Sequence, residues 1–455
     1  MAIDVSNKNE KKVNLTGSQI AVALISAHET LTMQNDLYNI GVPGTIGFGV
    51  GAIPVSQIPT GMFAMEGHYD KSHANYGNVI DSSGSIMVAI PKFYYKIVEN
   101  SFLVSSAIPK FYYKIVENSF LISAIPLADY VLDRMFINAG VELDYVLVDK
   151  YSCGNVNGIF TSKAGIDPCS TNTAHNPIGS LINTPSNTNG GLYKAVKTRG
   201  VNHFLTSIFI YSALARLAKA HGDAATVATC AFKDVAPYLP KGNNNNALKD
   251  TNDASVTYEA SGYSNCGKTR AITNFAKTTH NGQNSGVADL NGNMYEVASG
   301  FIRTTALGFL VLKETVDIAS FTSDSTTVGG FQAYDTNLYD VIDLSDLIPS
   351  NETGSWTNVG NGVNQVFGMS TDRSSAAYKR TSILMPLATG VVAGGTTEFG
   401  SDGIYKILRD GFSCLVGLSW SNGSAAGVFA SNLSGARSFS NDNVGGRASL
   451  NVKMS

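Results

Sequence analysis

The chain has 455 residues, a net charge of −3, and 15% charged side chains against 44% hydrophobic ones. It is long enough for two or three domains, and its charge predicts neither a nucleic-acid-binding footprint nor attraction to anionic membranes. With so few charges and 45 glycines, Ser, Thr, Asn and Gly must cover the surface, which suits a β-rich protein that is extracellular or part of a particle.

No run of about 18 apolar residues occurs, and the N-terminus, MAIDVSNKNEKK, lacks the order of a secretory signal. We therefore expect no membrane insertion, and folding in the cytoplasm of the producing cell. The 5 cysteines include no Cys-x-x-Cys pair, which argues against a zinc knuckle and a disulfide framework. Buried reduced thiols are expected, with a Cys153–Cys169 disulfide as the alternative.

The first expected elements are a helix and a hairpin. Ser18 is placed to cap a short helix. Residues 76–95 alternate in hydrophobicity on both sides of a turn at Asp81–Gly84, which predicts a β-hairpin.

A direct repeat follows. The segment AIPKFYYKIVENSFL occupies 89–103 and recurs without change at 107–121, 18 residues later. Solenoids repeat many times with drift, so one perfect copy indicates a recent duplication or a sequence error. It predicts two similar strands, 92–98 and 110–116.

The middle of the chain mixes expected helices and strands. Residues 126–140 are interpreted as a helix ended by a glycine, and 145–151 as a strand. The clearest helix lies within 200–222, with Thr206 or Ser207 as its N-cap.

Later segments are more polar. Residues 241–250 (KGNNNNALKD) read as a polar loop, and from 271 onward short strands alternate with loops of Gly, Asn, Ser and Thr. In 410–450, apolar residues and glycines alternate with short polar side chains. Nucleophiles, bases and metal ligands are scarce there, so this stretch indicates a binding surface and not a catalytic centre.

The segment GVADLNGNMYEVASG (286–300) has Asp289 and two asparagines spaced like calcium-loop ligands. An EF-hand needs Gly and Glu where Met294 and Gly300 stand, so that interpretation fails and a tight Asn-Gly turn is favoured. The histidines are scattered singly and no G-x-S-x-G elbow occurs. We therefore expect no catalytic residue, no metal and no cofactor, with calcium near Asp289 left open.

Three motifs in fixed order resemble the formylglycine-generating-enzyme-like domains: YVLVDKYSCGN (145–155), GVADLNGNMYEVASG (286–300) and GLSWSNG…GARS…VGGR near the C-terminus. The matching positions are Asp289, Gly292, Asn293, Glu296, Gly417, Trp420, Arg437, Gly445 and Arg447. The resemblance implies an α+β chain with a C-terminal C-type-lectin-like fold of the formylglycine-generating-enzyme-like variety, preceded by a β-rich N-terminal region.

Two enzyme branches of that superfamily fit poorly. The oxidase branch has a pair of reactive cysteines in its terminal motif, where this chain has Cys414 alone. The iron-dependent sulfur-transferring branch needs a histidine cluster. The sequence is more similar to phage receptor-binding proteins of the major tropism determinant kind, targets of diversity-generating retroelements, and its N-terminal phrases resemble tail-fibre proteins.

This resemblance implies a non-catalytic phage tail-fibre or tail-tip adhesin in the virion tail. Its partners would be a host surface receptor (glycan or protein) and other virion tail proteins, with the adhesin itself a homotrimer. The expected regions are particle attachment or trimerisation (1–85), a β-rich connector with the repeat (86–126) and the lectin-like domain (127–455). The alternatives are a formylglycine-generating-type or sulfur-oxidising enzyme, and a structural baseplate or head-decoration subunit.

Short polar side chains of the terminal motif are expected to contact the receptor. Residues at the motif positions that match the family are expected to hold the fold. The expected contact residues are Ser421, Asn422, Ser424, Phe429, Ser431, Asn432, Ser438, Ser440, Asn441 and Asn443. The expected scaffold residues are Trp420, Arg437, Arg447, Asn293 and Glu296.

Overall fold

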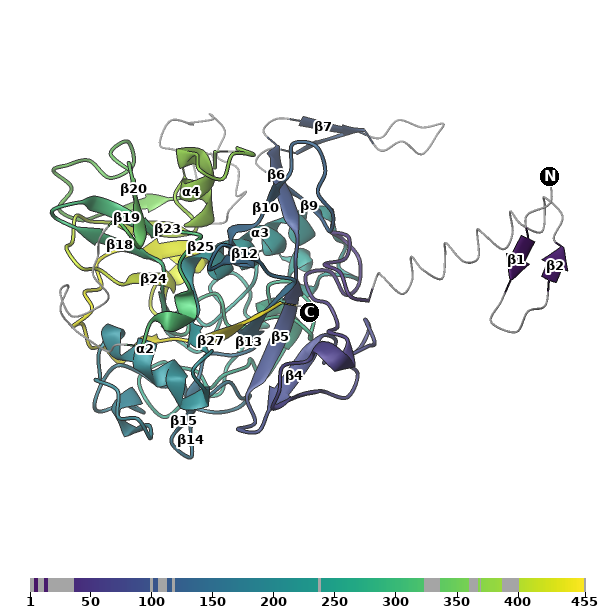
Figure 1. Cartoon of the computed structure of the whole chain (residues 1–455). Coiled ribbons are helices and arrows are strands. Elements are labelled where there is room, and N and C mark those ends of the chain that lie inside the picture. The colour runs from purple at the N-terminus through teal and green to yellow at the C-terminus, as the bar shows by residue number, and fades with distance from the viewer. Residues whose placement is uncertain are drawn as a thin grey trace.

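Two six-stranded sheets organise the structure (Figure 1), which is a computed structural model. The residues it describes are 37–98, 101–104, 113–116, 119–235, 239–322, 336–359, 367–368, 370–386 and 401–453, together with the short strands 4–6 and 12–14. The described residues form both helices and strands, with more strands than helices, in agreement with the expected α+β class. None of the helices in this part of the chain is long and apolar enough to cross a membrane.

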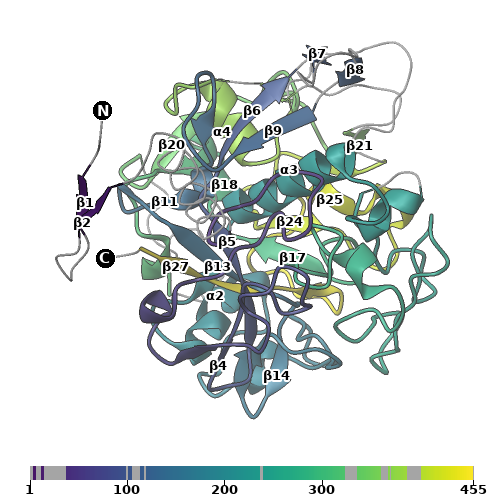
Figure 2. The same cartoon turned by 90° about the vertical axis from the view of Figure 1, so that its right-hand side faces the viewer.

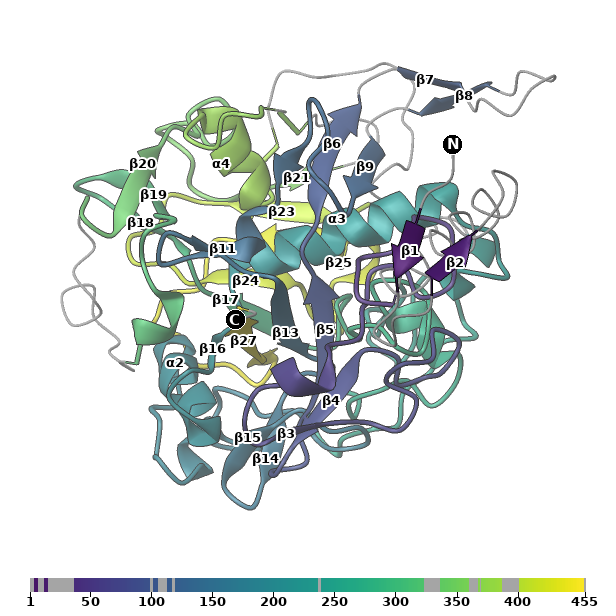
Figure 3. The ribbon, with the colours of Figure 1, turned by 45° about the vertical axis from the view of Figure 1, so that its right-hand side comes forward.

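The first sheet is antiparallel, in the order β16-β27-β13-β5-β4-β3. Figure 2 shows its strands β27, β13, β5 and β4, and Figure 3 labels all six. Its strands are β3 (Met62–Ala64), β4 (Asn78–Asp81), β5 (Ile86–Pro91), β13 (Tyr145–Asp149), β16 (Phe204–Leu205) and β27 (Ala448–Val452). In the central strand, Leu147 is paired with Ala89 on one side and with Leu450 on the other.

This pairing corrects the expected domain boundary. The region 1–85 was expected to be separate from the lectin-like domain, but β3 and β4 belong to the same sheet as β13 and the C-terminal β27. Because β5 hydrogen-bonds β4 on one edge and β13 on the other, the chain before residue 85 completes this sheet. Composition alone could not reveal pairing between segments so far apart.

The expected hairpin is confirmed as β4–β5. The Gly84 N–H donates to the Asp81 carbonyl (3.0 Å), and the Asp81 carboxylate accepts the N–H groups of Ser83 (2.9 Å) and Ser85 (3.1 Å). Gly84 has φ +83°, a conformation that glycine adopts without strain. The strand expected at 145–151 is also confirmed, as β13.

The second sheet has the order β21-β23-β25-β24-β17-β26. Its strands are β17 (Tyr295–Ala298), β21 (Ser355–Asn358), β23 (Gly403–Lys406), β24 (Cys414–Gly417), β25 (Gly427–Asn432) and β26 (Val444–Gly445). Two of its pairs are parallel, β23 with β25 and β17 with β26. These strands confirm the short strands and loops expected from residue 271 onward.

Helix α3 (Ile208–Ala224) crosses the molecule beside the second sheet (Figure 3) and contacts β25. Ser207 is its N-cap, because the hydroxyl accepts the Ile210 N–H. The sequence therefore predicted the start of the helix correctly. Every residue from Ile208 to Gly222 is buried, so α3 is a core helix and not one with a solvent-facing side.

The helix expected at 126–140 is wrong. This segment has positive φ at Asp129 (+64°) and at Ala139 (+52°), which interrupts a right-handed helix. Asp133 does not lie on a polar surface but is buried, where it accepts the Met135 N–H and the Arg216 guanidinium. The observed elements are β10 (Val131–Leu132), a 3₁₀ turn (Arg134–Phe136), β11 (Ile137–Asn138) and β12 (Val141–Glu142).

The other elements are short. They are β1 (Asp4–Ser6), β2 (Lys12–Asn14), β14 (Gly154–Val156), β15 (Ile159–Thr161), α2 (Leu192–Ala195), β18 (Phe301–Thr304), β19 (Gly308–Leu312), β20 (Tyr339–Ile342) and α4 (Ala376–Ser382), with 3₁₀ turns at Val55–Gln57, Ile178–Ser180, Asn189–Gly191, Val196–Arg199, Ala231–Asp234, Phe275–Thr278, Ile318–Ser320 and Gly423–Ala425. The helix expected after Ser18 lies outside the described residues.

The described strands of the two repeat copies pair with each other. β6 (Tyr94–Val98), from the first copy, pairs with β9 (Ser119–Ser123) at the end of the second. β7 (Ser101–Val104), from the first copy, pairs with β8 (Tyr113–Val116) from the second. The Val98–Ser119 pair is followed by Ser101–Val116 without a shift of register, so one hairpin is nested inside the other.

We expect deletion of residues 101–118 to leave the fold intact. The deletion joins Asn100 to Ser119, which recreates the natural sequence of one repeat copy. It leaves a two-residue Glu-Asn connection, the commonest loop length for hairpins. Ile97 and Phe120, which pair across β6–β9 and are buried, keep all their partners. Thermal unfolding followed by circular dichroism should show a midpoint within about 3 °C of the full chain.

Replacing 101–118 with a Gly/Ser linker of equal length is the matched control. It keeps the chain length but removes the strand-forming side chains. Loss of cooperative unfolding in both variants would show that β7 and β8 stabilise the body of the fold.

Candidate functional site

The candidate site consists of two loops at the C-terminal end of the chain. The first display loop (419–425) connects β24 to β25, and the second display loop (438–443) precedes β26. All three strands belong to the second sheet. The sheet therefore fixes both ends of the first loop and the C-terminal end of the second.

Trp420 anchors the first display loop. Its side chain is 6% exposed and packs with Cys266 and Met294. Its backbone N–H donates to the Asn293 carbonyl (3.2 Å), and its carbonyl accepts the Asn246 N–H (2.6 Å). The tryptophan therefore joins this loop to two distant segments of the chain.

The rest of this loop is held by its own polar groups. The Asn422 side-chain oxygen accepts the N–H (2.9 Å) and the hydroxyl (2.8 Å) of Ser419. The Gly423 N–H donates to the Asn244 carbonyl (2.7 Å). The main chain is thus fixed while short side chains face outward: Ser421 and Ser424 are exposed and Asn422 is half-buried.

Arg437 lies at the base of the second display loop. Its side chain is buried, 5.8 Å from the centroid of the Tyr193 ring. The Gly190 N–H donates to its carbonyl (2.9 Å), and the Asn189 N–H donates to the Phe439 carbonyl (2.9 Å). These bonds attach the loop to the segment that leads into α2.

Thr171 supports the other side of the same loop. Its hydroxyl accepts the Asn441 N–H (2.9 Å) and its carbonyl accepts the Ser440 hydroxyl (2.6 Å). The two display loops also touch, because the Asn443 side-chain amide donates to the Ser419 hydroxyl (3.3 Å). The two loops therefore form one display surface.

The structure brings together seven of the expected contact residues on this surface. They are Ser421, Asn422, Ser424, Ser438, Ser440, Asn441 and Asn443, all exposed or half-buried.

The expectation is wrong for the other three. Phe429, Ser431 and Asn432 lie in β25, which is paired with β23 and β24 and has every residue buried. The Phe429 ring lies 6.4 Å from the Phe120 ring and 5.9 Å from the Phe367 ring, measured between centroids. These residues were expected as contacts because they stand between the frame positions of the terminal motif, but every residue of this strand is covered.

Two exposed residues beside the expected contacts were not predicted from the sequence. Phe439 is 41% exposed and lies between Ser438 and Ser440, so its position among expected contacts was a usable signal. Asn246 is exposed in the 241–250 loop and contacts Trp420 through its N–H. Nothing in the sequence placed that loop beside the C-terminal motif.

The 241–250 loop is part of the support beneath the display surface. The Asn243 side chain donates to the Asn293 side-chain oxygen (2.9 Å), and the Asn244 side chain donates to that of Asn291 (3.0 Å). All four asparagines are buried. Buried amides hydrogen-bonded to each other hold one conformation, because any other would leave polar groups unsatisfied.

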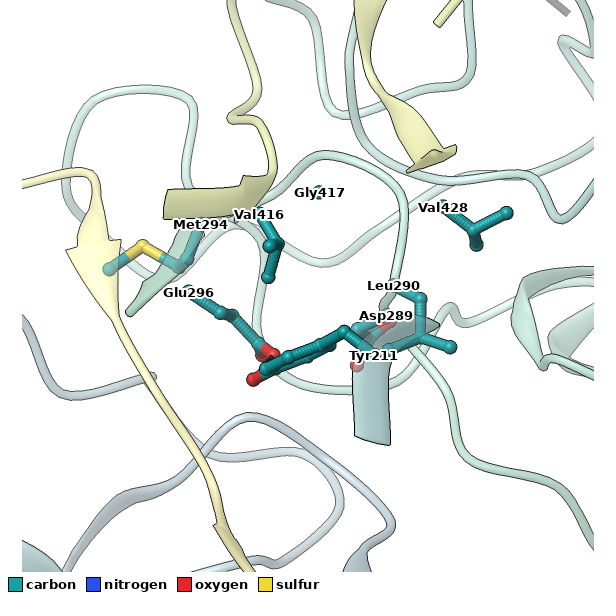
Figure 4. Close-up of a pocket in the computed structure, with 8 residues that line it drawn as sticks. All are labelled: Tyr211, Asp289, Leu290, Met294, Glu296, Val416, Gly417 and Val428. Carbon is teal, nitrogen blue, oxygen red and sulfur yellow. Dashed lines mark hydrogen bonds between the residues drawn. The ribbon is translucent and has the colours of Figure 1, made fainter. Parts of the chain in front are cut away.

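Glu296 and Arg447 form a buried ion pair behind this support. The Glu296 carboxylate accepts both the Arg447 Nε (2.7 Å) and Nη2 (2.6 Å), and also the Tyr211 hydroxyl (2.6 Å) and the Ser152 hydroxyl. Figure 4 shows the Tyr211 hydroxyl directed at this carboxylate. Burial and the neighbouring Glu296 raise the pKa of Tyr211 well above its usual range.

The five expected scaffold residues are all buried: Trp420, Arg437, Arg447, Asn293 and Glu296. The cavity beside Glu296, lined also by Tyr211 and Asp289, is only about 10 Å³ (Figure 4). It is far below the size of a small-ligand site. These residues therefore fit a structural role and not a substrate pocket.

Calcium binding near Asp289 was left open by the sequence. The Asp289 carboxylate accepts hydrogen bonds from groups of the protein itself. These are the Tyr258 hydroxyl (3.0 Å) and the Arg270 N–H (3.0 Å). Burial raises the pKa of this carboxyl. In the described part of the chain no group of three or more His, Cys, Asp and Glu side chains is arranged to hold a metal ion. A calcium site here has no support from the geometry.

All five cysteines are buried free thiols, as the sequence predicted. Cys414 is fully buried, and burial raises the pKa of its thiol. A reactive cysteine needs partial exposure and a lowered pKa, and Cys414 has neither.

Asp402 lies directly behind β25 and carries a pH prediction. Its carboxylate is 3% exposed and accepts the Phe429 N–H (2.8 Å), and burial raises its pKa well above the usual range. The folded state therefore keeps this proton after the unfolded state has lost it. Stability is greatest below the unfolded-state pKa and falls as pH rises towards the folded-state pKa, by at most about 1.4 kcal/mol per pH unit.

We expect Asp402→Asn to remove this loss. Asparagine can still accept the Phe429 N–H but cannot ionise. In urea unfolding between pH 5 and pH 8, the variant should gain stability relative to the parent as pH rises. Asp129→Asn is the control, since that carboxylate is 75% exposed. An equal pH dependence in the parent and Asp402→Asn would contradict the prediction.

The described loops thus present short polar side chains, together with Phe439 and Asp442, on a buried, hydrogen-bonded frame. No family model matches this chain, and no curated protein matches its sequence.

The solved structures to which this chain is similar include variants of the major tropism determinant. The U1 variant has a TM-score of 0.29 and 12% identity over 81% of this chain and 64% of that chain. The M1 variant has a TM-score of 0.30 and 12% identity over 82% and 64%, and the I1 variant has a TM-score of 0.28 and 11% identity over 83% and 82%. This chain thus spans less than two thirds of the U1 and M1 variants. The C-type-lectin-like fold and its formylglycine-generating-enzyme-like variety stay predictions.

Proposed function

We propose that this protein is a phage tail-fibre or tail-tip adhesin whose display surface binds a host surface receptor, glycan or protein, without chemistry. The observation that carries the proposal is the arrangement of seven short polar side chains on two loops with a fixed main chain. The motif resemblance to phage receptor-binding proteins supports the same assignment.

The physical properties of the display surface suit recognition. Serine and asparagine lose little side-chain entropy on binding and adapt their hydrogen bonds, as in antibody paratopes. Phe439 adds an exposed aromatic ring among them, and aromatic residues are enriched in binding hot spots. Because the loops are anchored through Trp420 and Thr171, substitutions at the exposed display positions Ser421, Ser424 and Ser438 can change the partner without altering the frame.

The enzyme alternatives receive no comparable support. The oxidase type needs reactive cysteines, and Cys414 is buried with a raised pKa. A particle subunit without receptor binding would bury the display surface against other virion proteins. That alternative is tested by whether antibodies against the display loops bind intact particles and block adsorption.

Individual polar contacts are weak, so we propose several copies per particle, as in a homotrimer joined to other tail proteins, with avidity supplying attachment. A light-scattering mass of the full chain tests the trimer.

The decisive experiment replaces the seven display residues with those of a relative of different host range and measures adsorption. We expect adsorption to the original host to fall at least about tenfold, because several contacts are lost together, while the unfolding midpoint is unchanged. Asp343→Ala with Ser345→Ala, on an exposed loop after β20, is the matched control. Unchanged host range with the replaced display residues would refute the assignment.

A further inference from the structure

The strand at the outer edge of the second sheet carries an exposed tryptophan. β21 is the end strand of this sheet, next to β23, and its Trp356 is 45% exposed. The other tryptophan of the chain, Trp420, is only 6% exposed. Single exposed apolar residues are common on protein surfaces, so the surroundings of Trp356 have to show whether this one has a function.

The indole ring of Trp356 is held against the neighbouring strand. Trp356 is directly paired with Tyr405 of β23, and the centroids of the two rings are 5.1 Å apart. The indole also covers Gly403, where an added Cβ atom would lie 3.0 Å from its Cε3 atom and 3.1 Å from its Cζ3 atom. Because residue 403 has no side chain, the ring can approach the backbone of β23. Tyr405 and Gly403 therefore support one side of the ring, and nearly half of Trp356 still faces solvent.

Trp356 lies beside the first display loop. The same added Cβ atom at Gly403 would be 3.4 Å from the Ala425 Cβ, so Ala425 and the indole flank the same side of β23. Ala425 is the last residue of the first display loop and follows the exposed Ser424. The display surface therefore continues from Ser424 across Ala425 to the Trp356 ring.

The charged residues next to this ring pair with each other. The Lys406 ammonium of β23 lies 3.9 Å from the carboxylate of Glu352, which precedes β21. The same carboxylate accepts the Gly354 N–H (3.0 Å) and the Ser355 hydroxyl (3.1 Å). This pair leaves no excess charge beside Trp356 that would select an ionic ligand.

We propose that Trp356 extends the display surface as a stacking platform for one sugar ring of a host surface glycan. The inference rests on the proposed receptor-binding function and narrows its receptor to the glycan class. A sugar ring has an apolar face of C–H groups, which packs on the electron-rich face of an indole. Its hydroxyl groups lie around the rim, where short polar side chains such as Ser424 can hydrogen-bond to them.

The size of the aromatic platform favours a sugar over a protein. A protein receptor buries roughly 800 Å² on each partner around a cluster of large apolar anchors. Around Trp356 the neighbours on this side are Gly403 and Ala425, so the apolar area is about that of one ring. A protein receptor is therefore the alternative outcome of the test.

The first test is acrylamide quenching of tryptophan fluorescence in the full chain, with polysaccharide extracted from host cells by hot phenol as the probe. Because Trp420 is buried, quenching reports mainly on Trp356. We expect the polysaccharide to reduce quenching in a saturable manner. Periodate, which cleaves the vicinal diols of sugar rings, should abolish the effect of the polysaccharide, whereas proteinase K should not. Absence of protection, or protection that survives periodate, overturns the proposal.

Substitutions at Trp356 provide the second test. Trp356→Ala should weaken binding of the full chain to host cells at least about tenfold, while Trp356→Tyr, which keeps an aromatic ring, should retain most of the binding. Phe63→Ala is the matched control, because Phe63 is 63% exposed on β3, the end strand of the first sheet, and should leave binding unchanged. Full binding by Trp356→Ala overturns the proposal. If Trp356→Ala does not fold, Trp356→Tyr and the quenching experiment still test it.

Treatment of the host cells separates this inference from the proposed function. Periodate-treated cells should lose adsorption and proteinase-treated cells should keep it. The reverse result, with adsorption still dependent on the seven display residues, would overturn the glycan class and leave receptor binding in place. Adsorption that does not depend on the display residues would refute receptor binding by this surface, and this inference with it.

Discussion

Replacing Glu296 with alanine should destabilise the protein by about 3–5 kcal/mol, the usual cost of removing one partner of a buried ion pair. Arg447 would keep a buried positive charge, with the Asp149 and Ala288 carbonyls as its remaining acceptors. The Tyr211 hydroxyl would lose the carboxylate that accepts its hydrogen bond. Urea unfolding of the parent and the variant measures this difference.

Glu259→Ala is the matched control for Glu296→Ala. Glu259 pairs with Lys268 at the surface and its side chain is 55% exposed, so its removal should cost less than about 1 kcal/mol. If both variants lost equally little, the pair formed by Glu296 and Arg447 would not be the frame of the C-terminal region.

Phe429→Ala should lower stability by about 3–5 kcal/mol, as is usual for truncating a buried aromatic side chain. The ring is fully buried between Phe120 and Phe367, and its loss leaves a cavity under the sheet. A receptor-contact residue would behave differently, with weaker binding and unchanged stability. Thermal unfolding and host-cell binding of the same preparation separate these outcomes.

Phe439→Ala provides the comparison on the same chain segment. Its ring is 41% exposed on the display surface, so we expect a stability change below about 1 kcal/mol and reduced binding to host cells. If Phe429→Ala unfolded normally but bound poorly, the burial of β25 would be contradicted.

The sequence predicted correctly those elements whose formation depends on residues close to one another in the chain. The Ser207 cap, the Asp81–Gly84 turn and the strand at 145–149 each depend on residues within a few positions of one another. The failure at 126–140 has the opposite cause. The side chain of Asp133 is drawn inward by Arg216, 83 positions away in sequence, and no local pattern shows this.

The candidate site was likewise predicted only in part. The family resemblance placed Trp420 and Arg447 in the frame, because both stand at motif positions that match the family, and both side chains are buried. It could not separate Ser431 from Ser438, since the two have the same chemistry and differ only in whether a neighbouring strand covers them. Support from the 241–250 loop was likewise not predicted, because it depends on contacts between segments far apart in sequence.

Because one hairpin is nested inside the other, the arm formed by β6, β7, β8 and β9 would change length in fixed steps if a repeat unit were gained or lost. Identical repeats favour recombination between the copies, which removes or adds one unit of 18 residues. Because the copies pair in continuous register, each added unit would extend both strands of the ribbon by half its length, about 30 Å. A lineage could thus change the reach of the arm in a single genetic event, with the core of the protein left as it was.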